Sequence, residues 1–528
     1  MDTLERLLAI EPQLSQMSQT FLENCSALKS TVSDLPSDTS ALEAVTCRIR
    51  SRLDSIKEIE RTLAESHAVL KGLVNLSSKI VPIQRMPPEV LSYVFTHTIP
   101  EYCAFESPDQ WSHPLVVITS VCTRWRQIAI QNSSLWIHVD FTSGLRSDNL
   151  ICDFNLPGLF LERSGDKLVH VHFGPPELNV VQAFDRMFRI LAPYVHRISS
   201  LNFPSDSTVE LVGCVFEACS GYASSPALTS LLIGSIEPKD RRDDTYIGIG
   251  WPTDFLCGLT SLQFGGLGWE GSKIHQGELF SILSGSPALK VLELRSTMIM
   301  SDYLDHPMID LPELQYLNLR KTDEGVLLLI LPKLACTRKD LHFEFNYAEG
   351  LESVPVITAF MARTHIGALG LWFDPDCHHS WSRRRNFLQD CSILEQYFLA
   401  LDGLRVLILE LNRAYARRIL DGLIVTVEEA VRPRLPGLNA LVCLEAALNL
   451  QSATRMKSYF DVSSLRTIDF PEYRAEEGVS EEDENLIDRL LEEIPCNEDE
   501  RKFNFDDMEG GWNDFIRDVL MENIASHG

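Results

Sequence analysis

The chain has 528 residues, a formal net charge of −27 and an apolar share of 45%. This length exceeds one ordinary hydrophobic core and predicts roughly two to four structural units. So acidic a chain repels phosphate backbones, which argues against nucleic-acid binding as its main role. It has no apolar run of about 18 residues and no basic start, so we expect neither a membrane span nor a targeting signal.

Residues 1–79 are expected to be helical. From Leu42 the sequence fits a heptad repeat in which eight of the ten residues at the two seam positions are apolar. The seam residues are Leu42, Val45, Ile49, Arg52, Ile56, Ile59, Leu63, Ser66, Leu70 and Leu73. Such a stripe is suited to packing against another helix. Two interpretations remain open: a coiled coil that makes a second copy of the chain a partner, or an intramolecular hairpin with an earlier helix at residues 7–28.

Residues 80–141 predict a compact unit of three short helices. Pro87, Pro88 and Glu89 suit a helix start, because the first turn tolerates proline and its dipole favours an acid. An apolar stripe follows at positions 90, 91, 94 and 95. We expect a loop at residues 100–114, a second helix at 115–122 and a third that contains Trp125. The alternating segment 136–141 predicts a strand.

Residues 142–474 repeat an apolar-x-x-apolar-x-apolar motif. Its eleven copies, the seventh with arginine in the first slot, recur about every 30 residues. They start at Leu168, Ile198, Leu228, Leu259, Leu289, Leu314, Arg338, Ile366, Leu404, Leu438 and Leu465. Helical stretches are expected between several copies, at 180–192, 209–219, 393–401 and 415–431. The pattern predicts an irregular leucine-rich-repeat solenoid of parallel strands and helices, and the alternative is an unrelated α/β domain with amphipathic strands.

The residues between the repeated leucines should face outward from the sheet. Among them are Glu293, Arg295, Tyr316 and Arg320. Arginine and tyrosine are enriched at binding hot spots, so we expect these four residues to bind a protein substrate. The alternative is a solvated sheet with cargo bound at loops or ends.

The last segment, residues 475–528, is expected to be a solvated acidic tail. It carries 18 acidic and four basic residues, which is about half of the net charge. The 13 cysteines show no CxxC pair and no regular framework. This scatter is typical of reduced thiols, so we expect a cytoplasmic or nuclear protein.

Residues 82–141 resemble an F-box. The matching motifs are Met86-Pro87-Pro88-Glu89-Val90-Leu91 with Val94-Phe95, then Val121-Cys122 with Trp125-Arg126, then Leu135-Trp136. The layout of helical start, box and irregular repeats is similar to the large F-box families common in fungi. The resemblance implies that the box docks on the Skp-type adaptor of a cullin–RING ubiquitin-ligase core and that the repeats bind a target. The adaptor-binding residues it implies are Met86, Pro87, Val90, Leu91, Val94, Phe95, Val121, Cys122, Trp125, Leu135 and Trp136.

A further observation supports an adaptor over an enzyme. Residues 266–273 only faintly resemble a phosphate-binding loop, because the serine precedes the lysine. Residues 374–379 gather Asp, Cys and His without the spacing of a metal site. We therefore expect no catalytic residue, no metal and no cofactor. The remaining alternative is a scaffold that uses the box without feeding a ligase.

Overall fold

The structure is a computed structural model of the whole chain. It describes residues 2–33, 39–76, 82–99, 114–141, 155–174, 181–205, 207–220, 227–236, 249–267, 273–302, 304–346, 352–372, 393–394, 396–401, 403–410, 424–427, 430–433, 435, 437–444, 446–448, 467–469, 473–475 and 486. The predicted loop at 100–114, apart from Pro114, and the metal-like segment 374–379 lie outside these residues. So does the acidic tail, apart from Ala475 and Leu486.

The chain divides into two compact units, Met1–Val94 with Thr119–Ile128 and Phe95–Ile118 with Ala129–Gly528. In the first unit, helices α1 (Asp2–Ser33) and α2 (Thr39–Leu76) occupy the segment that was predicted to be helical. Arg61 donates to Glu58 and Glu65 along α2, at 2.5 Å each. Ion pairs at these spacings stabilise a helix in its own right.

The described part of the heptad seam of α2, from Ile49 to Leu70, is largely exposed to solvent. Of the side chains described on α2, all are exposed except Ile56 and Gly72. Helix α1 likewise exposes Leu14, Met17 and Phe21. A hairpin in which the two stripes cover each other would bury these residues, which are exposed here. The choice between hairpin and coiled coil stays a prediction.

Three short helices follow, as predicted: α3 (Pro88–Thr98), α4 (Pro114–Val121) and α5 (Thr123–Gln131). A 3-10 turn, η1 (Pro82–Arg85), precedes them, and a second, η2 (Ser133–Trp136), ends the segment. The boundary between the two compact units runs through these helices.

A parallel sheet forms the main body of the second unit. Among the described residues it has 12 strands in chain order, and all neighbouring strands run parallel. The strands are β1 (His138–Phe141), β2 (Val169–Phe173), β3 (Ile198–Phe203), β4 (Ser230–Ile233), β5 (Ser261–Phe264), β7 (Val291–Leu294), β10 (Tyr316–Leu319), β12 (Leu341–Asn346), β13 (Ile366–Trp372), β14 (Val406–Glu410), β17 (Ala440–Leu444) and β19 (Thr467–Asp469). A strand lies at each of the eleven motif copies, and β1 lies at the strand predicted for 136–141.

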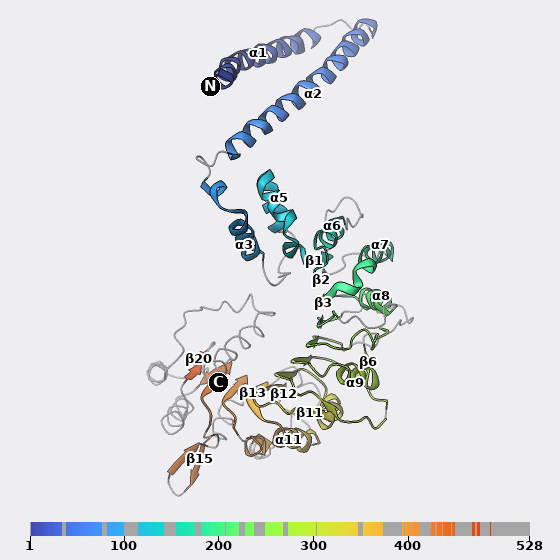
Figure 1. Ribbon diagram of the computed structural model, residues 1–528, viewed down its shortest axis with the longest axis vertical. Helices are drawn as coiled ribbons and strands as arrows, with labels where there is room; N and C mark the ends of the chain where they lie inside the picture. The colour runs from blue at the N-terminus through green and yellow to red at the C-terminus, as the bar shows by residue number, and fades with distance from the viewer. Residues whose placement is uncertain are drawn as a thin grey trace. The chain divides into compact units, whose positions relative to one another are not determined.

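Helices connect the strands on one side of the sheet. Figure 1 shows the strands following one another from β1 to β13, with α6, α7, α8 and α11 beside them. These helices are α6 (Asn155–Arg163), α7 (Val181–Leu191), α8 (Val209–Ser220), α9 (Gln276–Ser284), α10 (Glu324–Ile330) and α11 (Ser353–Arg363). Repeated strand–helix units of this kind are compatible with a solenoid, and their classification as leucine-rich repeats stays a prediction.

The repeated apolar residues form the interior beneath the sheet. Leu262, Leu292, Leu317, Phe343 and Leu369 are each 0% exposed, and they are neighbours across successive strands. A single strand–helix unit cannot bury these side chains by itself, because its apolar face is covered only by the neighbouring unit. Stacking is therefore the condition on which this body folds.

The helix predicted at 415–431 is wrong where the structure describes it. Strands β15 (Ile424–Val427) and β16 (Ala430–Pro433) pair there as an antiparallel hairpin. Residues 424–427 are Ile, Val, Thr and Val, and β-branched side chains favour strands over helices. No helix among the described residues is long and apolar enough to cross a membrane.

Three histidines gather on one face at the start of the sheet. His138 stacks on His170 with ring centroids 4.9 Å apart, and its ring lies 5.9 Å from that of His172. His172 is 7% exposed and is the register neighbour of Asp140. Burial, with the repulsion of His138 and His170, lowers the pKa of His172 to about 3.

We predict that stability falls as the pH falls below the ordinary pKa of histidine. The unfolded chain takes up a proton on His172 near pH 6.5, whereas the folded chain takes it up only near pH 3. Protons therefore favour the unfolded chain in this window, by at most about 1.4 kcal/mol per pH unit for one group. His172→Gln should flatten the pH dependence of the urea midpoint between pH 7 and 4. An unchanged slope would contradict the neutral, buried imidazole.

Candidate functional site

Helix α3 divides its apolar side chains between interior and surface. Pro87 and Pro88 begin the helix, and Glu89 stands in its first turn. Leu91 and Phe95, one turn apart, are 0% and 1% exposed. On another face, three large apolar side chains are exposed, namely Val90, Tyr93 and Val94. A helix that served only its own interior would not place all three in solvent.

Helix α4 makes the same division. Leu115 and Ile118, at i and i+3, are buried. Val116, Val117 and Val121 are exposed, with 39%, 52% and 48% of their surface in contact with solvent. Four of its eight residues are β-branched valine or isoleucine, which are not strong helix formers, so tertiary packing of the buried pair has to stabilise it.

Two arginines of α5 donate hydrogen bonds to backbone carbonyl oxygens of neighbouring segments. Arg124 Nη2 donates to the carbonyl oxygen of Met86 over 2.5 Å, and Arg126 Nε donates to that of Thr119 over 2.8 Å. These bonds fix the start of α5 against residues just before α3 and at the end of α4. Trp125, between the two arginines, is half-buried.

The end of the segment, from Ala129 on, belongs to the second unit and packs within it. Trp136 Nε1 donates to the carbonyl oxygen of Ala129 over 2.7 Å, and its ring meets that of Phe160 edge-on at 4.9 Å. The guanidinium of Arg163 lies 4.5 Å from the Trp136 ring centroid. Leu135 and Trp136 are 1% and 2% exposed, so both serve the interior.

The predicted adaptor-binding residues thus fall into three groups. Pro87, Val90, Val94 and Val121 are exposed; Met86, Cys122 and Trp125 are half-buried; Leu91, Phe95, Leu135 and Trp136 are buried. Three exposed residues of the same helices were missed, namely Tyr93, Val116 and Val117. Their helical spacing relative to Val90 and Val121 is the signal that points to them.

The predicted substrate-binding residues belong to a polar group on the sheet, which we call the sheet cluster. It spans four neighbouring strands, and its members are Glu293, Arg295, Tyr316, Asn318, Arg320, His342, Glu344 and Trp372. Asn318 Nδ2 donates to Tyr316 Oη over 2.9 Å. The ring centroids of Tyr316 and His342 are 4.8 Å apart. The Arg320 guanidinium lies 3.0 Å from the centroid of the Trp372 ring.

Charge in the sheet cluster is balanced at close range. Glu344, 1% exposed, lies 3.0 Å from His342 Nε2 and 3.7 Å from Arg320 Nη1. Burial raises the pKa of Glu344, but His342 and Arg320 outweigh it, and the net shift is downward. Glu293 pairs with Arg295, yet burial prevails there and raises the pKa of Glu293. A buried carboxylate with such partners is held by them, and losing one partner is costly.

The expectation that all four predicted substrate-binding residues face solvent is wrong for Glu293. It is 2% exposed, and its strand neighbour Asn318 is 0% exposed. Arg295, Tyr316 and Arg320 are partly exposed, with 33% of the Arg295 side chain and 15% of the Arg320 side chain accessible. The alternation of the strand places Glu293 on this face, but long neighbours on the same face cover it.

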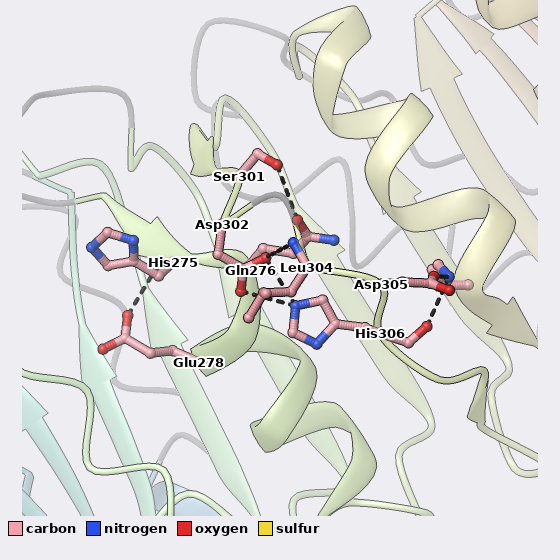
Figure 2. A network of polar contacts seen from close by, with 9 residues as sticks. His275, Gln276, Glu278, Ser301, Asp302, Leu304, Asp305 and His306 are labelled. Atoms are coloured by element: carbon pink, nitrogen blue, oxygen red, sulfur yellow. Dashed lines mark hydrogen bonds and ion pairs between the residues drawn. The ribbon is translucent and has the colours of Figure 1, made fainter.

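A second polar network joins α9 to the segment after β8 (Ile299–Met300). Figure 2 shows His306 Nε2 beside the Asp302 carboxylate, at 2.9 and 3.0 Å, and Ser301 Oγ donating to Gln276 Oε1 over 3.2 Å. Lys333 Nζ donates to Asp305 over 2.5 Å. Lys333 lowers the pKa of Asp305. Each polar group in these contacts has a partner within the network. The network therefore has a structural role: it holds the segment 301–306 in place. Among the described residues no group of three His, Cys, Asp or Glu side chains could hold a metal ion.

A substitution at Gly370 tests how closely the sheet cluster is packed. A Cβ at this position would lie 2.8 Å from Glu344 Cγ and 3.1 Å from Trp372 Nε1. Gly370→Ala should therefore lower the free energy of unfolding by about 1–3 kcal/mol. The matched control is Gly213→Ala in α8, where nothing lies within 4 Å, and which should raise it by about 0.5–1 kcal/mol. Thermal unfolding of both variants checks this, and a neutral Gly370→Ala would contradict the close packing.

Comparison with known proteins agrees with the resemblance in the box. Residues 83–142 match the F-box-like family model, which covers α3, α4, α5, η2 and β1. No curated protein matches the chain. An F-box-like domain implies binding to the Skp-type adaptor of an SCF complex and, generally, a substrate-adaptor role in such ligases. The chain therefore carries an F-box-like domain at residues 83–142.

Proposed function

We propose that this chain is the non-catalytic substrate-recognition subunit of an SCF-type ubiquitin ligase in the cytoplasm or nucleus. The F-box-like domain binds the Skp-type adaptor and thereby the cullin–RING core, and the parallel-sheet body, as irregular leucine-rich repeats, binds a protein target. The observation that carries the proposal is the exposure of six apolar side chains on α3 and α4 of that domain, namely Val90, Tyr93, Val94, Val116, Val117 and Val121.

The exposed apolar area on α3 and α4 can stabilise a complex. Burying apolar surface contributes roughly 25 cal/mol per Å² before the costs of association. The exposed side chains are short aliphatics and one tyrosine, so little rotamer entropy opposes their burial. Leu91 and Phe95 support this surface from within, because they hold α3 in place without reaching solvent. Buried and exposed members of the same helix thus serve one binding event.

The target surface is assigned to the partly exposed residues of the sheet cluster. Arg295 and Arg320 keep part of their side-chain surface accessible, while buried Glu293 and Glu344 hold them in position. Tyr316 begins β10, the strand that ends just before Arg320. Pre-positioned arginine and tyrosine side chains lose little freedom when a target binds.

An alternative is a scaffold that uses the F-box-like domain without a ligase. The exposed apolar stripe of α2 favours it, since such a stripe assembles proteins without ubiquitin chemistry. The two functions differ in one outcome: a ligase receptor purifies with the cullin as well as the adaptor, whereas a scaffold does not bring down the cullin.

Substitutions on the exposed faces test adaptor binding. Val94→Asp and Val117→Asp should each weaken capture of the Skp-type adaptor at least about tenfold, because a charge would be buried in the contact. The matched control is Leu168→Asp, also an exposed aliphatic but outside the F-box-like domain. Affinity is measured by calorimetry with purified adaptor. Full affinity in both α3 and α4 variants would refute the assigned surface.

Arg295→Ala tests the target surface separately. It should lower target capture while adaptor capture stays constant, because Arg295 lies on the sheet and not in the F-box-like domain. Arg338→Ala is the control, since Arg338 is also partly exposed and paired, with Glu313, but lies outside the sheet cluster. Quantitative affinity purification reports both partners at once. Equal loss of target and adaptor would mean that Arg295 is structural.

A further inference from the structure

The described apolar seam of α2 lies open to solvent. Ile49, Ile59, Leu63 and Leu70 on this seam are between 38% and 59% exposed. A helix of 38 residues with an aliphatic stripe in water is stabilised mainly by packing of that stripe. Helix α1 of the same chain exposes its own stripe and does not cover this one in the described residues.

Charge is unevenly distributed along α2. Residues 46–57 carry four basic side chains against one acidic, whereas residues 58–71 carry three acidic against two basic. The basic half includes Arg48, Arg50 and Arg52, and the acidic half includes Glu60 and Glu65. A helix with opposite charge at its two halves is complementary to a copy of itself that runs in the opposite direction.

The residues of the seam also favour an antiparallel pair over a parallel one. In a parallel pair of copies Arg52 would face Arg52 of the partner subunit inside the seam, and two guanidinium groups would repel each other there. In an antiparallel pair centred between Ile56 and Ile59, each polar seam residue meets an aliphatic one. Arg52 then lies opposite Leu63 of the partner subunit, with Glu60 of the partner subunit within about one turn.

We infer that α2 binds α2 of a second copy of this chain as an antiparallel coiled coil. In this register Ile49 meets Ser66 of the partner subunit, and Ile56 meets Ile59 of the partner subunit. The helix is about 57 Å long at 1.5 Å per residue. The two chains leave the coil at opposite ends, and the F-box-like domain follows α2 within a few residues. On the proposed function, one dimer therefore carries two ligase-docking domains, one following each end of the coil.

Cysteine cross-linking of the full chain tests direction. In a background with Cys25→Ser and Cys47→Ser, which removes the two exposed cysteines of α1 and α2, one tagged chain carries Ile49→Cys and another carries Ser66→Cys. These positions face each other in the antiparallel pair and are then close enough for a disulfide. Oxidation of the co-expressed chains should give the mixed dimer, while each variant alone gives little cross-linking. Self-cross-linking of Ser66→Cys would indicate a parallel pair and overturn the inference.

Charge reversal gives an independent readout. Arg48→Glu, Arg50→Glu and Arg52→Glu together should weaken dimerisation at least about tenfold at low salt, and adding Glu58→Lys, Glu60→Lys and Glu65→Lys should restore it. In a parallel pair, reversal leaves like charges facing each other and restores nothing. Light scattering of the unaltered chain should give twice 59.6 kDa. A mass of 59.6 kDa at micromolar concentration would overturn the inference. Adaptor capture is measured on the same samples: its loss with the dimer intact would refute only the proposed function.

Discussion

The constraint on which the account depends is that the short helices of the F-box-like domain have too few interior positions for their apolar side chains. A segment of about 60 residues buries only part of its apolar surface alone. Helix α3 meets this limit by turning Leu91 and Phe95 inward while Val94 stays exposed, and α4 does the same with Leu115 and Val117. The surface left over is a cost in the free chain and a binding surface once a partner covers it.

The units of the parallel-sheet body also have too few interior positions of their own for their apolar side chains. Each unit is instead covered by the next unit of the same chain, as the 0% exposure of Leu262 and Leu317 demonstrates. Polar side chains on the other face then come together from different units. The sheet cluster brings Arg320 and Trp372 into contact across 52 residues of sequence, and Glu344 is charged at that place because His342 and Arg320 stand beside it.

Much of the architecture was predictable from local patterns, and solvent access was not. Each of the eleven motif copies lies at a strand, because two or three apolar residues at fixed spacing suffice to define a buried strand face. Alternation also placed Glu293 on the correct face. Strand alternation does not show which long side chains from neighbouring units cover that face. The burial of Glu293 was therefore not predicted. The motif of the box likewise does not separate buried Phe95 from exposed Val94. The helix expected at 415–431 is wrong at 424–427, where β-branched side chains favour strand β15.

The most direct test of the account is hydrogen–deuterium exchange of the full chain with and without the Skp-type adaptor. Amide exchange reports where backbone hydrogen bonds become protected when a partner covers them. The account predicts slower exchange in α3 (Pro88–Thr98) and α4 (Pro114–Val121) on adding the adaptor, with exchange in strands β5 to β13 unchanged. Protection confined to the sheet, or none at saturating adaptor, would contradict the claim that the exposed apolar side chains of these two helices are the adaptor-binding surface.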